Sequence, residues 1–293
     1  MCSQLNIFAL PKPSVIQPLS FEAELKRIED AFIALNPTYA GLLVESDPIK
    51  KVLEAWAYDR VNWVNHFNES ARQTMLAYAN GSNLDQSAAN SVTPRLPNES
   101  DESLRYRASI APEGFTCAGP SGAYEYHSLK VSSDVMHATV LAHTPIQGYV
   151  TVVLLSHSNN GEASEELRDQ VWNHLSAEEV RPLCDTVHVE KAIFKDTEII
   201  IKATYFEGSD KDEVNARILK SLEYLSELNA TERKAKDIFK PKEMLTVNQI
   251  HQAARVAGVQ NIEVISPKND IQPGAKESIR IVKREIKDGG WYE

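Results

Sequence analysis

The stretch 42–85, LLVESDPIKKVLEAWAYDRVNWVNHFNESARQTMLAYANGSNLD, predicts one unusually long helix. Asp47 is a favourable N-cap residue, and Pro48 suits the first helical position because the N–H that it lacks has no partner there. The pair Asn80-Gly81 supplies a left-handed stop at the other end. The sequence therefore predicts a helix from Pro48 to Ala79. At a rise of about 1.5 Å per residue it would span on the order of 48 Å, more than one small core requires.

Apolar side chains recur along this stretch at helical spacing and form two adjacent stripes. The first stripe contains Ile49, Leu53, Trp56, Trp63 and Phe67. The second contains Ala57, Val61, Val64, Ala71, Met75 and Tyr78. Together they are too wide for a single line of contact. The helix is therefore either the central core helix of a self-contained domain or a helix shared with other subunits, and the pattern alone leaves both interpretations open. If it is shared, the candidate inter-subunit contacts are Ile49, Leu53, Trp56, Val61, Trp63, Val64, Phe67, Met75 and Tyr78.

Composition narrows the classes of partner. The 293-residue chain has 42% hydrophobic and 25% charged residues and a formal net charge of −10. No apolar run approaches the roughly 20 residues needed to cross a bilayer, and the N-terminus MCSQLNIFALPKPSV lacks the features of a signal peptide, so we expect a cytosolic protein. The negative charge repels nucleic acid and anionic membranes, and no basic stripe with interleaved aromatic residues offsets it. We expect protein partners, with no nucleic acid and no membrane.

The cysteines offer no framework for a disulfide or a metal site. Cys2, Cys117 and Cys184 are an odd number, widely spaced, and form no CxxC pair. We expect them to be small packing residues.

The N-terminal part of the chain is predicted to be an extended arm followed by helices. The segment Pro11–Pro18 is extended, since proline and the residue before it both favour extended backbone, and an arm of this kind usually docks on something. Ser20 caps a helix over Phe21–Leu35. The segment TPRLPNES at 93–100 marks the first boundary, and Asp101 is expected to cap the helix after it.

The rest of the chain predicts an α+β fold with two small mixed sheet units. The first has the order β-β-α-β, with strands expected at 135–143, 149–155 and 186–194 and a helix capped by Ser164. The second has the order β-α-α-β-β, with strands at 198–206, 259–265 and 278–283. Its helices are expected over 210–228 and from a Thr246/Gln249 capping box through Ala257, with Gly258 in a Schellman ending. We therefore expect three domains: an arm and helical bundle region over 1–97, and α/β domains over 98–194 and 195–293.

No constellation in the sequence predicts catalysis, a metal or a cofactor. His137 and His143 lie on one face of a strand but about 20 Å apart, too far to share an ion, and we interpret them as exposed strand histidines. Ser156 and His157 follow a strand without the GxSxG spacing of a nucleophile elbow or an assignable acid. The run Gly119-Pro120-Ser121-Gly122 lacks the spacing of a phosphate-binding loop.

Four stretches in the same order resemble the baseplate J-like family of contractile-tailed phages. They are the long-helix stretch itself, DESLRYRASIAPEGFTCAGPSGAYEYHS, VVLLSHSNNGEASEELRDQVWNHLSAEEVRPLCDTVHVEKA, and VNQIHQAARVAGVQNIEVISP. The resemblance covers nearly the whole chain. The chain departs from it in the polar SHSNNG, where relatives often carry an arginine in SR-x-G-x-G, which puts any contact made by that loop in doubt.

The resemblance implies a non-enzymatic structural subunit of a baseplate wedge in the virion tail, assembled in the host cytoplasm. Two copies would join one smaller I-type tail protein through a helical bundle, and the C-terminal units would link neighbouring wedges around the hub. Bistable interfaces between wedges would hold the baseplate closed and rearrange when receptors engage, which would start sheath contraction. One alternative is the equivalent part of a headless contractile bacteriocin, and a less favoured one is a tail-associated hydrolase, which would need a convergent catalytic set in one cleft.

Overall fold

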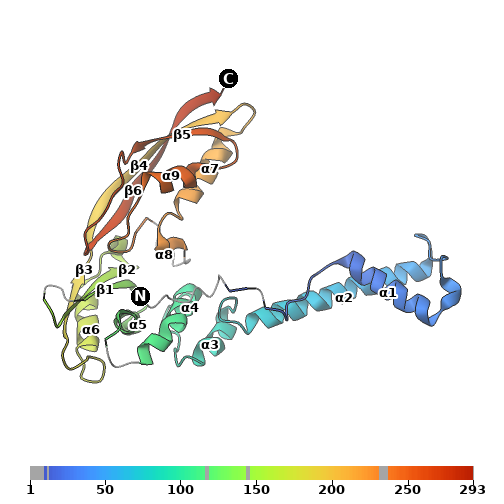
Figure 1. Cartoon of the computed structure of the whole chain (residues 1–293), viewed down its shortest axis with the longest axis horizontal. Coiled ribbons are helices and arrows are strands. Elements are labelled where there is room, and N and C mark those ends of the chain that lie inside the picture. The colour runs from blue at the N-terminus through green and yellow to red at the C-terminus, as the bar shows by residue number, and fades with distance from the viewer. Residues whose placement is uncertain (1–9, 12, 116–118, 143–145, 231–236, 293) are drawn as a thin grey trace. The chain divides into compact units, whose positions relative to one another are not determined.

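The computed structural model describes residues 10–11, 13–115, 119–142, 146–230 and 237–292. Its internal contacts divide the chain into two compact units, Met1–Pro94 and Arg95–Glu293 (Figure 1). The first unit is helical, and the second contains both sheets.

The helical unit is built on two helices that lie side by side (Figure 1). Its elements are α1 (Phe21–Leu35), the 3₁₀ turn η2 (Pro37–Tyr39), α2 (Pro48–Gln73) and α3 (Gly81–Ala89). Ser20 caps α1 by accepting a hydrogen bond from the amide of Ala23, and Asp47 caps α2 through the amide of Ile49. Both predicted helix starts are therefore confirmed.

The prediction that the long helix reaches Ala79 is wrong, because α2 ends at Gln73. The hydroxyl of Thr74 donates back to the carbonyl of Ala71 at 2.8 Å. The side chain of Gln73 accepts a hydrogen bond from the amide of Asn80, which ties the turn to the start of α3. These local bonds compete with the next helical turn. The helix is about 39 Å long at 1.5 Å per residue.

The N-terminal arm docks near the C-terminal end of α2. The side-chain oxygen of Asn68 accepts from the amide of Gln17 at 2.9 Å, and its nitrogen donates to the carbonyl of Gln17 at 2.8 Å. Asn68 is 2% exposed, whereas Gln17 is exposed, so both bonds are partly shielded from solvent. The side-chain amide of Asn68 thus pairs with both backbone groups of Gln17, as a neighbouring strand would do in a sheet.

The second unit begins with a buried ion pair. Ser100, and not the expected Asp101, is the N-cap residue of α4, since its hydroxyl accepts from the amide of Ser103. The preceding residue, Glu99, makes a bidentate pair with Arg107 at 2.7 Å, and both side chains are almost fully buried. The chain is therefore firmly anchored where the second unit starts.

The first sheet has the predicted order β-β-α-β. The elements of this half are α4 (Asp101–Ile110), η3 (Ala111–Phe115), α5 (Ser121–Val131), β1 (Val135–Ala142), β2 (Tyr149–Ser156), η4 (Asn159–Gly161), α6 (Glu165–Leu175) and β3 (Thr186–Lys191). The strand order is β1-β2-β3, with the first pair antiparallel and the second parallel. Ser164 caps α6 as predicted.

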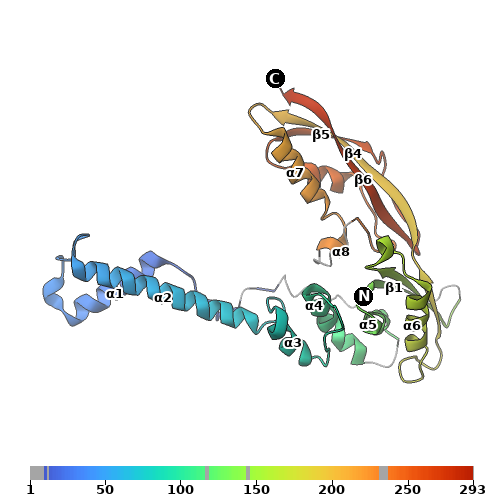
Figure 2. The same ribbon diagram turned by 180° about the vertical axis from the view of Figure 1, so that it is seen from behind.

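The second sheet also has the predicted order of elements. They are β4 (Ile193–Phe206), α7 (Lys211–Leu222), α8 (Glu227–Ala230), α9 (Val247–Ala254), β5 (Val259–Ser266) and β6 (Glu277–Tyr292). The strand order is β5-β4-β6, with β5 antiparallel and β6 parallel to β4. Helices α7 and α9 lie on one face of this sheet in both views (Figure 1 and Figure 2).

Several expected boundaries in this half are wrong. Strand β4 starts at Ile193, β6 continues to Tyr292, and the helix expected over 210–228 is divided into α7 and α8. The Thr246/Gln249 capping box is present, but α9 ends at Ala254. Gly258 lies in the turn before β5 at a φ of 99°, where a Cβ atom would come within 2.6 Å of a Val214 methyl group.

One apolar cluster joins the two sheets. Its buried members are Met136, Val153, Leu155, Ala192, Leu228 and Ile238, which come from both halves of the second unit. The predicted α+β class with two small mixed sheets is confirmed. The division into three domains stays a prediction, and both sheets lie in one compact unit.

Candidate assembly surface

One side of α2 exposes a line of large apolar side chains. The line consists of Val52 (65% exposed), Trp56 (61%), Trp63 (63%) and Phe67 (47%), and we call it the α2 stripe. At 3.6 residues per turn these positions fall within an arc of about 60°. Isolated exposed apolar residues are ordinary, but aligned tryptophan and phenylalanine side chains are typical of protein contact surfaces.

The neighbouring side of α2 is covered by α1. Leu53 and Ala57 are buried there together with Ile28 of α1, and Ile49 packs against them. Exposure therefore separates side chains that the sequence placed in one stripe. Leu53 and Ile49 serve the core of this unit, whereas Trp56, Trp63 and Phe67 face solvent.

The other candidate contact residues are placed differently. Val61 and Val64 are half-buried on α2. Met75 and Tyr78 lie beyond the end of α2, where Met75 is half-buried and Tyr78 is 37% exposed. These two are not continuous with the α2 stripe by helical spacing. All the candidate residues stay predictions as inter-subunit contacts.

Sequence reasoning missed Val52, which precedes Trp56 by one helical turn and continues the stripe. The i, i+4 spacing from Val52 to Trp56 and from Trp63 to Phe67 is the signal that identifies it. Tyr58 is also 64% exposed but lies on the opposite side of α2.

Charged residues beside the α2 stripe also link α1 to α2. Glu24 of α1 contacts Arg27 at 2.7 Å and Arg60 of α2 at 3.4 Å. The hydrogen bond from Arg27, aided by the charge of Arg60, lowers the pKa of Glu24. Exposed pairs of this kind contribute about 0–1 kcal/mol each, so the apolar contacts dominate the α1–α2 pair.

His137 is not the exposed strand histidine that the sequence suggested. It is 6% exposed on β1, and its Nδ1 atom lies 3.3 Å from a carboxylate oxygen of Glu125 on α5. The hydroxyl of Tyr106 donates to the same Glu125 oxygen. This buried group links α4, α5 and β1. His143 lies outside the described residues.

Ser156 and Ser158 meet an acid, but in an arrangement that secures a loop. Their hydroxyls donate to Asp134 at 2.7 and 2.6 Å. Burial opposes the ionisation of Asp134, yet the hydrogen bonds from Ser158 and Ser156 outweigh it and lower its pKa. In a triad the serine hydroxyl donates to a histidine, whereas here both serine hydroxyls donate directly to the carboxylate, so the arrangement is not that of a triad. The loop is the SHSNNG segment in which the resemblance places an arginine.

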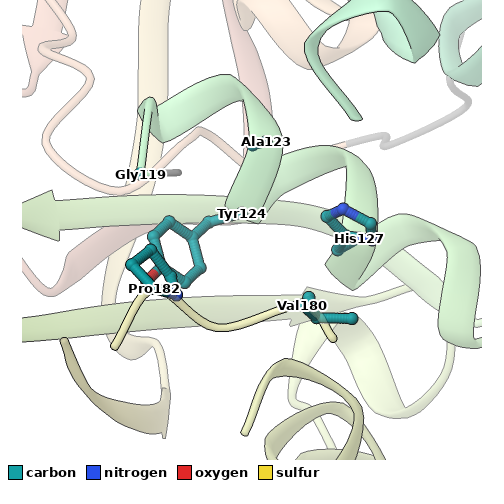
Figure 3. A pocket seen from close by; sticks show the side chains of 6 residues that line it. All are labelled: Gly119, Ala123, Tyr124, His127, Val180 and Pro182. Atoms are coloured by element: carbon teal, nitrogen blue, oxygen red, sulfur yellow. The ribbon is translucent and has the colours of Figure 1, made fainter. Parts of the chain in front are cut away.

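A small hollow of about 180 Å³ lies beside α5. Figure 3 shows its lining: Gly119, Ala123, Tyr124, His127, Val180 and Pro182. The hydroxyl of Tyr124 donates to Asp185 at 2.7 Å, and burial raises the pKa of Tyr124.

The described residues contain no group of three or more His, Cys, Asp or Glu side chains placed to hold a metal ion. Cys184 is exposed, which corrects the expectation that the cysteines pack in the interior; Cys2 and Cys117 lie outside the described residues. No helix within the described ranges is long and apolar enough to cross a membrane.

Known proteins resemble this chain along almost its whole length. The model of the baseplate J-like N-terminal domain matches residues 45–99, and that of the baseplate J-like central domain matches residues 116–191. Baseplate protein J of Escherichia phage P2 is 33% identical over 98% of this chain and 98% of its own length.

The chain belongs to the baseplate J-like family.

Membership confirms the resemblance found in the sequence and gives the chain a structural role in a phage baseplate, in the tail of the virion. The N-terminal family domain contains the complete α2 stripe, and the central domain contains α5 and the first sheet. Among solved structures, a chain of the anti-feeding prophage baseplate is similar with a TM-score of 0.41 and 11% identity. The match covers 66% of this chain and 43% of that chain.

Proposed function

We propose that this chain is a wedge subunit of a contractile-tail baseplate and that the α2 stripe is its assembly surface. In each wedge, two copies join one smaller I-type tail protein through a helical bundle. The second unit links neighbouring wedges around the hub. The subunit assembles in the host cytoplasm and has no enzymatic role.

The exposure of the α2 stripe carries this proposal. Leu53 and Ala57 already satisfy the contact between α1 and α2, so Trp56, Trp63 and Phe67 add nothing to that core. Fully burying one such side chain contributes about 1.5–3 kcal/mol. A helical partner that covered all three would therefore gain several such contributions. This supports a helix that is shared between subunits over a core helix that packs only within its own domain.

Membership of a family of structural proteins supports the non-enzymatic role. The serines at Asp134 and the buried His137 also have partners that fix the fold, as expected for structural side chains.

A headless contractile particle would use the same subunit contacts. Neighbouring genes for capsid and DNA packaging distinguish the two kinds of particle.

Co-expression with the neighbouring tail genes tests the assembly surface. We expect Trp56→Asp and Phe67→Asp each to lower recovery of the complex with the I-type protein, because a carboxylate would be buried at the contact. Loss of about 2 kcal/mol would weaken binding by about 30-fold. Native mass measurement of the unsubstituted complex reports the number of copies.

Tyr58→Asp is the matched control, since Tyr58 is an equally exposed aromatic residue on the opposite side of the same helix. It should leave recovery unchanged. Normal recovery of both stripe variants would show that the α2 stripe is not the assembly surface. Circular dichroism of each purified variant separates lost binding from lost folding.

A further inference from the structure

Two histidines meet where α5 packs against α6. His127 on α5 and His174 in the last turn of α6 have ring centroids 5.7 Å apart, at an interplanar angle of 49°. Each residue is half-buried. The Nδ1 atom of His127 and the Nε2 atom of His174 are nevertheless shielded from solvent and have no hydrogen-bond partner. Two neutral rings tolerate this contact, whereas a proton on either would be buried without an acceptor.

The charged surroundings of the pair are positive. Lys130 of α5 acts on both rings, and the one compensating contact is the bond from His127 to the carbonyl of Gly114 in η3. On the loop after α6, Arg181 and Asp185 act on Tyr124, and Asp185 accepts its hydroxyl. Among the described residues, no carboxylate contributes to the pKa shift of either histidine.

Burial, followed by the neighbouring His174 and Lys130, lowers the pKa of His127. Burial and then Lys130 lower the pKa of His174. An unstructured histidine has a pKa of about 6.5, so the unfolded chain takes up these protons first as the pH falls. The stability that the neutral pair contributes is complete above about pH 6.5 and is lost progressively below it.

We propose that His127 and His174 form an acid-sensitive latch that holds α5 against α6 while both rings are neutral. Protonation places a charge between two helices that both contribute apolar side chains to one core cluster, Leu129 from α5 and Val171 from α6. The helices then separate at this end. His127 also lines the hollow beside α5, together with Val180 and Pro182 (Figure 3).

Urea unfolding of the full chain between pH 5 and 8 tests the latch. Trp172 of α6 reports on this half through its fluorescence, since its indole donates to the carbonyl of Val187 on β3. Each proton taken up on unfolding raises the unfolding constant by up to about 10-fold per pH unit below pH 6. We expect His127→Gln and His174→Gln each to reduce that slope by about one proton.

His188→Gln is the control. His188 is an exposed histidine on β3, the strand that follows α6, and its ring stacks on Tyr149. It should leave the slope of the unsubstituted chain unchanged. Slopes for both latch variants that run parallel to the unsubstituted chain would overturn the proposal.

Histidine ring resonances of the unsubstituted chain provide a second test that needs no variant to fold. The latch predicts that His127 and His174 take up their protons at lower pH in the folded chain than histidines of the unfolded chain do. Protonation of both rings near pH 6.5 without loss of the α5–α6 contact would overturn it.

Discussion

At the scale of single residues, Val92 has a conformation that its side chain disfavours. Its φ is 52°, and it is 71% exposed. The amide of Thr93 bonds to the carbonyl of Ala88, and the amide of Val92 bonds to that of Ala89. This pairing is a Schellman motif at the end of α3, in which Val92 takes the left-handed position usually filled by glycine. The strain lies two residues before the boundary between the two units.

We predict that Val92→Gly stabilises the helical unit by about 0.5–1 kcal/mol. The left-handed conformation costs a residue with a Cβ atom about 1–2 kcal/mol, which glycine avoids. The greater freedom of glycine in the unfolded chain cancels part of this stabilisation. Urea unfolding measures the change. Val92→Ala keeps the Cβ atom and should give a smaller gain, so an equal gain from both variants would contradict left-handed strain as the cause.

At the scale of elements, the arm and α2 depend on each other through Asn68. Its buried side-chain amide makes both hydrogen bonds to Gln17. The arm also leaves Val15 and Leu19 more than 40% exposed, so it buries little apolar surface of its own. Hydrogen bonding therefore contributes more to arm docking than apolar burial does.

We predict that Asn68→Ala releases the arm while α1 and α2 stay paired. Loss of the two hydrogen bonds to Gln17 costs about 0.5–1.5 kcal/mol for each bond. Hydrogen exchange of the Gln17 amide should accelerate accordingly, with no change in the amides of α1. Asn68→Asp retains the acceptor and should give an intermediate rate. The exposed Asn65→Ala is the control, and an unchanged Gln17 rate in Asn68→Ala would show that other contacts hold the arm.

Sequence reasoning was accurate for elements fixed by local chemistry. Ser20, Asp47, Ser164 and the Thr246/Gln249 box start helices where their side chains predict, because each cap bonds to amides within three residues. The end of α2 was missed because it depends on Gln73 reaching Asn80, a contact across a turn. Strand ends were missed for a similar reason, since pairing with β4 extends β6 to Tyr292 through a charged segment with a Gly-Gly bulge.

The candidate surface shows the same limit. Helical spacing identified the apolar positions of α2, but it could not assign Leu53 to the interior and Trp56 to solvent, because α1 determines which side is covered. His137 was misplaced since α5 covers its side of β1 and supplies Glu125 as a partner. Both outcomes depend on which helix packs on which face.

At the scale of the whole molecule, the two units differ in the side chains that they bury and expose. The second unit is a pair of sheets joined by a shared apolar cluster, and its Asp134 and His137 side chains have structural partners. The helical unit is smaller and exposes tryptophan and phenylalanine along α2. Aligned tryptophan and phenylalanine side chains are typical of protein contact surfaces, so protein association is the use that best fits the α2 stripe.

Hydroxyl-radical footprinting of assembled baseplates, compared with the isolated chain, tests that central claim most directly. Trp56, Trp63 and Phe67 should be oxidised several-fold more slowly in the baseplate, because a partner helix would cover them. Tyr58, on the opposite side of α2, should be oxidised at a similar rate in both samples. Equal oxidation of the α2 stripe in the isolated chain and in the baseplate would contradict its role as the assembly surface.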